Sequence, residues 1–331
     1  MFQALYTYGI EPENVCILGK CYSTNERVAK NMQEEGIYVS SLSAFFDSHC
    51  SYDFLLDKIV LQFLVDCFKR KHNYDRYIVL DDGGHLLSAI IRHFEHLSPK
   101  IVGIEQTSSG FEKLKHCSLP FPVFNIATLS LKKRYEPQWV AQLILDQIAK
   151  KFPSYHLKSK HILIMGNGAM GSAFNQLLRE TYQVTVYEKM DPMRPNLGQL
   201  LPEVDLILGC TGVTSIPKIH HGLLKKGCLL ASASSSDREF DSVHFRKRFP
   251  SYSNCHFDLD TGRVHLINSG FPLNFTGDEH SIGPEKIQLV RALLMSGILQ
   301  AGALKDHTPG YISFDDRVQS AIGKHFADTC M

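Results

Sequence analysis

The feature that most constrains this chain is a glycine-rich turn within residues 161–191. An apolar run at residues 162–165 leads into Gly166, and the turn reads Gly-Asn-Gly-Ala-Met-Gly as far as Gly171. A helical pattern follows, and a second apolar run at residues 184–187 ends on Glu188. This order of strand, turn, helix and strand predicts a βαβ unit with parallel strands.

Each part of this unit meets a requirement of dinucleotide binding. Gly166 permits a tight turn, Gly168 lets the backbone approach a pyrophosphate, and Gly171 lets the helix pack closely on the strand. The helix N-terminus, at Ala169 and Met170, supplies N–H groups and a positive dipole for phosphates. The alternative is a glycine-rich turn between strand and helix that binds no ligand.

The acid at the end of the second strand indicates which cofactor is bound. Glu188 follows the turn by about 20 residues, the spacing expected of an acceptor for the ribose hydroxyls. Its negative charge disfavours the 2′-phosphate of NADP. We therefore predict an NAD site in this part of the chain.

Composition excludes several other classes of function. The 331 residues suffice for two domains, and the net charge of +1 gives no electrostatic footprint for nucleic acid. Nine cysteines without a C-x-x-C pair indicate reduced thiols and a cytoplasmic protein. The 16 histidines show no metal-ligand spacing, so we predict no metal. No apolar run approaches the roughly 18 residues of a membrane span, and we predict no membrane partner.

Short apolar runs alternate with helical patterns along the whole chain, which is typical of an α/β protein with mostly parallel sheets. The runs form two series, one before and one after residue 161, linked by a helical pattern at residues 136–152 in which Trp139 is interpreted as a packing residue. We predict two Rossmann-like doubly wound domains with a central cleft. The substrate-type domain comprises residues 1–132 plus 284–331, and the NAD-binding domain comprises residues 137–283.

Several segments occur in the order found in one known family. Residues 80–84 read Leu-Asp-Asp-Gly-Gly, residues 104–110 read Ile-Glu-Gln-Thr-Ser-Ser-Gly, and residues 210–213 read Cys-Thr-Gly-Val. With the glycine turn, and between about residues 14 and 300, this chain resembles the S-adenosylhomocysteine hydrolase family. The resemblance implies a tightly held NAD that transiently oxidises a ribose 3′-hydroxyl of a nucleoside, so that an oxidoreductase step serves a net hydrolase reaction in one-carbon metabolism.

The resemblance also implies catalytic residues. Lys132 lies where the family places a catalytic lysine, seven residues after Asn125, although it also reads as part of a basic linker. Asp82 matches the family's catalytic aspartate, although an aspartate before two glycines is also ordinary turn chemistry. Glu136 stands where the family has an aspartate.

Further site residues follow from the same resemblance. Gln106 and Thr107 are expected to bind substrate, and His280 to stand in for a family histidine near the domain cleft. Thr211, with Gly212, and Asn274 match positions near the cofactor ribose and the nicotinamide.

The chain also departs from the family pattern. Gln106 replaces a glutamate and cannot act as a base, and Ser235 replaces a histidine near the nicotinamide. The N-terminal substrate segment and the C-terminal tail of the family have no match here. We therefore do not expect efficient hydrolysis of adenosylhomocysteine. Two hypotheses stay open: an NAD-dependent enzyme that uses the same transient hydroxyl oxidation on another nucleoside-type or related hydroxylated substrate, or an inactive NAD-bound binding or regulatory protein. In either case we expect a small-molecule partner and a homo-oligomer, most simply a dimer.

Overall fold

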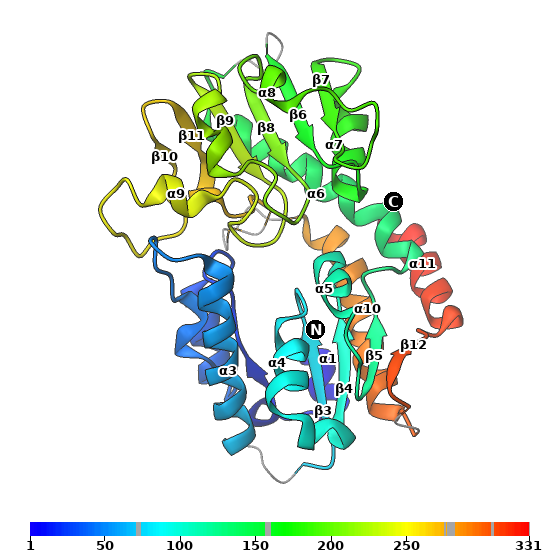
Figure 1. Ribbon diagram of the computed structural model, residues 1–331. Coiled ribbons are helices and arrows are strands. Elements are labelled where there is room, and N and C mark those ends of the chain that lie inside the picture. The colour runs from blue at the N-terminus through cyan, green and yellow to red at the C-terminus, as the bar shows by residue number, and fades with distance from the viewer. Residues whose placement is uncertain (71–73, 156–159, 275, 277–281, 306–307, 331) are drawn as a thin grey trace.

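The protein is described from a computed structural model that covers residues 1–70, 74–155, 160–274, 276, 282–305 and 308–330. Figure 1 shows two lobes, each built on a sheet of mostly parallel strands with helices on both faces. The α/β architecture predicted from the alternating pattern is confirmed.

The sheet of the first lobe has the strand order β12-β5-β4-β3, and all its pairs are parallel. Its strands are β3 (Tyr77–Asp81), β4 (Ile101–Glu105), β5 (Pro122–Asn125) and β12 (Gly310–Ile312). These four strands follow one another in chain order. The short strands β1 (Cys16–Ile17) and β2 (Tyr38–Val39) pair with each other in a separate parallel sheet.

The helices of the first lobe cover both faces of its sheet. They are α1 (Phe2–Thr7), α2 (Glu26–Glu34), α3 (Tyr52–Arg70), α4 (His85–His93), α5 (Ser108–Leu114), α10 (Pro284–Ala303) and α11 (Asp316–Cys330), with the 3-10 turns η1 (Pro12–Asn14), η2 (Ser41–Ala44) and η3 (Glu95–Lys100). Along β4, Ile101 packs toward α3 and α4, whereas Val102 and Ile104 pack toward α10. Such two-sided burial explains why the strand reads as a continuous apolar run.

The sheet of the second lobe has the order β10-β11-β9-β8-β6-β7, with only the β10 edge antiparallel. Its strands are β6 (His161–Met165), β7 (Gln183–Tyr187), β8 (Leu206–Gly209), β9 (Cys228–Ser232), β10 (Leu259–Asp260) and β11 (Val264–Leu266). From β6 the chain moves first to β7 on one side and then to β8 on the other. This reversal is the topological switch point at which doubly wound sheets bind ligands.

The helices of the second lobe are α6 (Ser130–Lys151), α7 (Ala169–Leu178), α8 (Leu197–Leu200) and α9 (Ser242–Arg246), with η5 (Lys218–Leu223) and η6 (Ile267–Gly270). The helix α6 begins 6 residues before the predicted helix at residue 136. It connects the lobes, because Leu131 packs in the hydrophobic core of the first lobe and Val140 packs in the core of the second lobe. Trp139 stacks on Tyr135 and contacts Phe326 of α11, which fits its interpretation as a packing residue.

A buried seam joins the lobes and consists of residues 46–53 packed against residues 237–271. Arg246 is fully buried, and its guanidinium donates to the Ser48 carbonyl oxygen at 2.9 Å and to Asp237 Oδ2 at 2.5 Å. Beside it, the Phe271 ring lies 5.1–5.5 Å from three rings of the first lobe, those of Tyr22, Phe46 and Tyr52. The seam therefore fixes one side of the boundary between the lobes.

Candidate functional site

The glycine turn follows β6 at the switch point and has the geometry that its sequence predicts. Gly166 has a φ of +96°, which is costly for other residues. A Cβ on Gly171 would lie 1.9 Å from the Gly166 carbonyl oxygen, so only glycine fits there. A Cβ on Gly168 would meet nothing within 4 Å. The space over Gly168, at the start of α7, is thus left open for a group such as a phosphate.

Glu188 lies against this turn. Its Oε2 atom accepts a hydrogen bond from the Asn167 backbone N–H at 2.9 Å, and its Oε1 atom accepts one from the Met190 N–H at 3.3 Å. The carboxylate is therefore held beside the turn by the backbone, and it has further lone pairs for hydroxyl donors. This is the placement required of a ribose acceptor.

The loop after β8 forms the other side of the switch point. Glu239 is fully buried, and one carboxylate oxygen accepts hydrogen bonds from the backbone N–H groups of Thr211 and Gly212, each at 2.6 Å. The carboxylate also accepts from the hydroxyls of Thr211, at 3.0 Å, and Ser215, at 2.8 Å. Burial raises the pKa of Glu239, and these hydrogen bonds oppose the rise. Glu239 thus fixes the loop, and sequence reasoning missed it.

Asn274 lies just beyond the end of β9. The preceding residue, Leu273, donates its N–H to the Ser232 carbonyl oxygen at 3.2 Å. The Asn274 Oδ1 atom is buried and has no hydrogen-bond partner among the described residues. A buried acceptor of this kind fits a ligand amide donor. His280, predicted to bind substrate, lies outside the described residues.

The second half of the site lies at the carboxyl ends of β3 and β4 in the first lobe. Asp82 follows β3 and accepts from Lys20 Nζ at 2.8 Å and from Gln106 Nε2 at 3.0 Å. Burial alone would raise the pKa of Asp82, but the charge of Lys20, with a smaller contribution from Lys132, lowers it. Lys132 is buried in the first turn of α6 and forms an ion pair with Glu136. The structure thus brings together the predicted residues Asp82, Gln106, Lys132 and Glu136.

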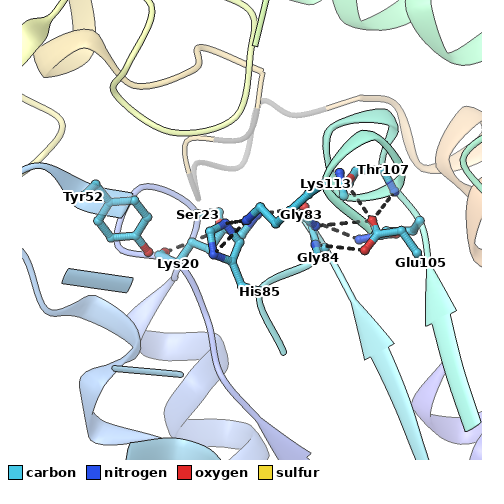
Figure 2. A network of polar contacts seen from close by, with 12 residues as sticks. Lys20, Ser23, Tyr52, Gly83, Gly84, His85, Glu105, Thr107 and Lys113 are labelled. Atoms are coloured by element: carbon cyan, nitrogen blue, oxygen red, sulfur yellow. Dashed lines mark hydrogen bonds and ion pairs between the residues drawn. The ribbon is translucent and has the colours of Figure 1, made fainter. Parts of the chain in front are cut away.

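A buried glutamate organises this edge. Glu105 ends β4 and accepts from the N–H groups of Gly83, at 3.3 Å, and Gly84, at 2.9 Å. It also accepts from the N–H and hydroxyl of Thr107, each at 2.7 Å (Figure 2). Burial, with the charge of its neighbour Asp81, raises the pKa of Glu105 to about 8. Glu105 therefore holds the turns that carry Asp82 and Gln106, and sequence reasoning missed it.

Thr107 forms hydrogen bonds within the protein. Its hydroxyl bonds Glu105 and accepts from the Gly110 N–H at 3.0 Å, so it caps α5. Its N–H and hydroxyl therefore already have protein partners. The role of Thr107 in substrate binding stays a prediction.

Three more polar residues at this edge were not predicted from the sequence. His85 is the first residue of α4, and its ring nitrogens lie 3.2 and 3.3 Å from Lys113 Nζ of α5 (Figure 2). The Nδ1 atom of His85 also lies 3.5 Å from Asp57 of α3. These residue types recur on many helices, and their separations of 28 residues give no local signal.

Arg238 connects the two halves of the site. It follows β9 in the second lobe and donates to Asp53 of the first lobe at 2.8 Å and to the Gly212 carbonyl oxygen at 3.1 Å. The carboxyl end of β9 therefore faces the lobe that carries Asp82. No cluster of three or more metal-ligating side chains occurs within the described ranges. Likewise, no helix in those ranges is long and apolar enough to cross a membrane.

Comparisons with known proteins give distant or uncharacterized relatives. No protein-family model matches the chain. Two uncharacterized proteins from strains of Mycobacterium tuberculosis are 39% identical to it over 310 residues, which is 91% of this chain and 61% of theirs. The chain thus spans about three fifths of the length of the curated relatives it matches.

Among solved structures, the chain is similar to the D-lactate dehydrogenase of Lactobacillus jensenii, solved with NAD+ (14% identity, TM-score 0.38, 89% of this chain and 99% of that one). It is also similar to the pyruvate reductase of Chlamydomonas reinhardtii (16% identity, TM-score 0.36, 95% of each chain). At this distance neither likeness assigns an activity to this chain.

These findings correct the predicted membership of the S-adenosylhomocysteine hydrolase family. The two similar solved structures are a dehydrogenase and a reductase, and the sequence relatives are uncharacterized. The physical reason for the error is that short motifs such as Asp-Asp-Gly-Gly and Thr-Gly serve turns at the carboxyl ends of parallel strands, a need that many α/β proteins share. The nucleoside substrate, the hydrolase reaction and one-carbon metabolism are withdrawn with it.

Proposed function

We propose that this chain is an NAD-dependent oxidoreductase that transfers hydride between nicotinamide and a small hydroxylated or carbonyl substrate, with net oxidation or reduction as its reaction. The observation that carries the proposal is the open space over Gly168 at the switch point, with Glu188 held beside the turn. The turn and Glu188 would hold the pyrophosphate and the adenosine ribose, and Asn274 would bind the carboxamide. Bound NAD would supply the hydride acceptor.

The first lobe supports the other half of the reaction. Oxidation of a hydroxyl requires a group that takes up the proton as the hydride leaves. Asp82 is suited to this because its side chain is 48% exposed while its partner Lys20 is largely buried. In this proposal Asp82 accepts the hydrogen bond of the substrate hydroxyl, Gln106 orients it, and Lys132 with Glu136 sets the local charge.

The test measures NAD binding and turnover separately. We expect calorimetry to detect NAD binding, and NADH absorbance to appear with one member of a panel of small hydroxylated compounds. Asp82→Asn, which removes the proposed proton acceptor, should lower that rate by about 10²–10⁴-fold and leave NAD affinity nearly unchanged. Lys133→Ala changes an exposed residue of α6 outside the site, and as the control it should leave the rate unchanged. The absence of NAD binding, or an equal loss of rate in both variants, would overturn the proposal.

The proposal also covers the domain limits, the oligomeric state and the cellular location. The lobes are taken as domains with the predicted limits, residues 1–132 plus 284–331 and residues 137–283. Hydrogen exchange should then show that NAD protects the second set as one unit. We also propose a homodimer, tested by light scattering, and a cytoplasmic location, supported by nine cysteines without a C-x-x-C pair and tested by fractionation.

A further inference from the structure

We propose that Lys113 and His85 form a binding site for an anionic group of the substrate, a carboxylate or a phosphate ester, at the edge of the first lobe. The inference rests on the proposed function only in assigning the anion to the substrate. The site itself is defined by side chains of α4 and α5, outside the cofactor turn.

The first observation is the contact between the two side chains. Lys113 Nζ lies 3.2 Å from His85 Nε2 and 3.3 Å from Nδ1, so the ammonium lies over the edge of the ring (Figure 2). A Cβ on Gly83 would lie 3.0 Å from the His85 ring, so the residue after Asp82 lies close to this contact and has no side chain there. The ammonium and imidazole are thus placed together next to the turn that carries Asp82.

The second observation is the charge balance of this edge. Lys20 pairs with Asp82, Lys132 pairs with Glu136, and Arg238 pairs with Asp53. Among the described residues, Lys113 has no carboxylate within ion-pair distance, and its ammonium lies within hydrogen-bond distance of His85, whose Nδ1 atom is itself 3.5 Å from Asp57. A partly buried ammonium is usually paired, and the missing partner here is an anion.

The third observation is the set of charged side chains around Lys113. Arg238 reaches from the second lobe to Asp53 of the first lobe, and its Nε atom is buried without an acceptor among the described residues. Burial first, and then the charge of Arg238, lowers the pKa of Lys113, while Asp81, Asp53 and Asp57 act in the opposite sense. A bound anion would relieve this repulsion and would lie between the two lobes.

The experiment uses the full chain without NAD and two probes, oxalate and inorganic phosphate. Binding is followed by the imidazole NMR signals of His85, assigned with a His85→Gln variant. We expect a saturable shift of those signals with at least one probe. Lys113→Gln should weaken the affinity by about tenfold or more, and Lys113→Arg should retain most of it. Lys115→Gln, an exposed lysine next to the same helix and paired with Glu112, is the matched control and should bind normally.

The outcomes separate the alternatives. Saturation with oxalate alone assigns a carboxylate, and saturation with phosphate alone assigns a phosphate ester. Signals that do not move with either probe, or equal losses in the Lys113→Gln and Lys115→Gln variants, overturn the site and leave a structural lysine–histidine contact. Because NAD is absent, failure of the cofactor proposal would leave this result unchanged, and NAD binding with no anion binding would overturn only the anion site.

Discussion

The two halves of the candidate site share one device and differ in how the chain builds them. Glu239 in the second lobe and Glu105 in the first are both fully buried, and each accepts hydrogen bonds from backbone N–H groups and from nearby hydroxyls. In the second lobe these bonds hold the loop after β8, and the glycine turn beside it has ligand groups that are contiguous in sequence. In the first lobe they hold two turns, and the polar side chains around those turns come from α4, α5, α6 and two loops.

This difference shows which interactions fix each half. The glycine turn binds through backbone N–H groups and through space that glycines leave open, so substitutions of neighbouring side chains should affect it little. The first-lobe edge depends on ion pairs between side chains, and each pair can be replaced by another. Substrate choice can therefore change in the first lobe while the cofactor half stays the same.

The largest effect is expected at the glycines. Gly171→Ala places a methyl group 1.9 Å from the Gly166 carbonyl oxygen, and it should cost about 3 kcal/mol or more of unfolding free energy. Gly168→Ala has room in the protein, so its stability should change by less than about 1 kcal/mol while NAD affinity falls. Urea unfolding and calorimetry measure both. Equal stability losses in the two variants would contradict the close-approach argument.

The buried glutamates give the next largest effect and a pH test. The pKa of Glu105 is raised from an ordinary value near 4.5 to about 8, so between these values the unfolded chain releases a proton that the folded chain keeps. This group therefore lowers stability as pH rises from about 5 to 8. Glu105→Gln should remove that slope, at a cost of about 1–3 kcal/mol at low pH from the mismatched N–H at Gly84.

Glu239→Gln is the companion variant in the second lobe. The pKa of Glu239 is also raised by burial. Glu239→Gln should therefore remove a loss of stability with rising pH, as Glu105→Gln does in the first lobe. It should also weaken the hydrogen bonds that hold the loop at Thr211 and Gly212. Unfolding measured across pH checks both variants. A first-lobe variant that weakened NAD binding as much as Glu239→Gln does would break the comparison between the halves.

A smaller effect is expected at Glu188. Glu188→Ala removes the ribose acceptor and the charge that repels a 2′-phosphate, so NAD affinity should fall about tenfold and the preference for NAD over NADP should narrow. Competitive calorimetry with both cofactors measures the ratio. Tighter binding of NADP than NAD by the unmodified chain would refute the role of Glu188.

The smallest effect on stability is expected at Lys20, whose ion pair with Asp82 lies at the partly exposed edge of the first lobe. Lys20→Met should change the unfolding free energy by less than about 1 kcal/mol. It should, however, raise the pKa of Asp82, because burial alone would raise that pKa and the charge of Lys20 opposes the rise more than any other neighbour does. The acidic limb of a pH–rate profile, or of Asp82 titration by NMR, should move to higher pH. An unmoved limb would show that Asp82 is not the group that titrates.

The cofactor half of the site could be predicted from the sequence more fully than the half in the first lobe. The glycine turn, Glu188 and the strand series could be predicted because their signals are local, with periods of two residues or one helical turn. The placement of Lys20 and Lys113 near Asp82 could not, because it depends on how separate strands and helices are placed in space. The family resemblance was wrong for a related reason, since it rested on turn motifs that serve the fold.

The seam limits how the two lobes can move. Separating them there would expose the Arg246–Asp237 pair to water and strip the Phe271 ring of its aromatic neighbours, so this side stays shut during ligand exchange. Small molecules must therefore enter and leave by another side of the lobe boundary. Any relative motion of the lobes is then a rotation about the seam, and it is largest at the side farthest from Arg246. Substitutions at Arg246 should therefore change the rates at which ligands leave the lobe boundary, although Arg246 contacts neither ligand.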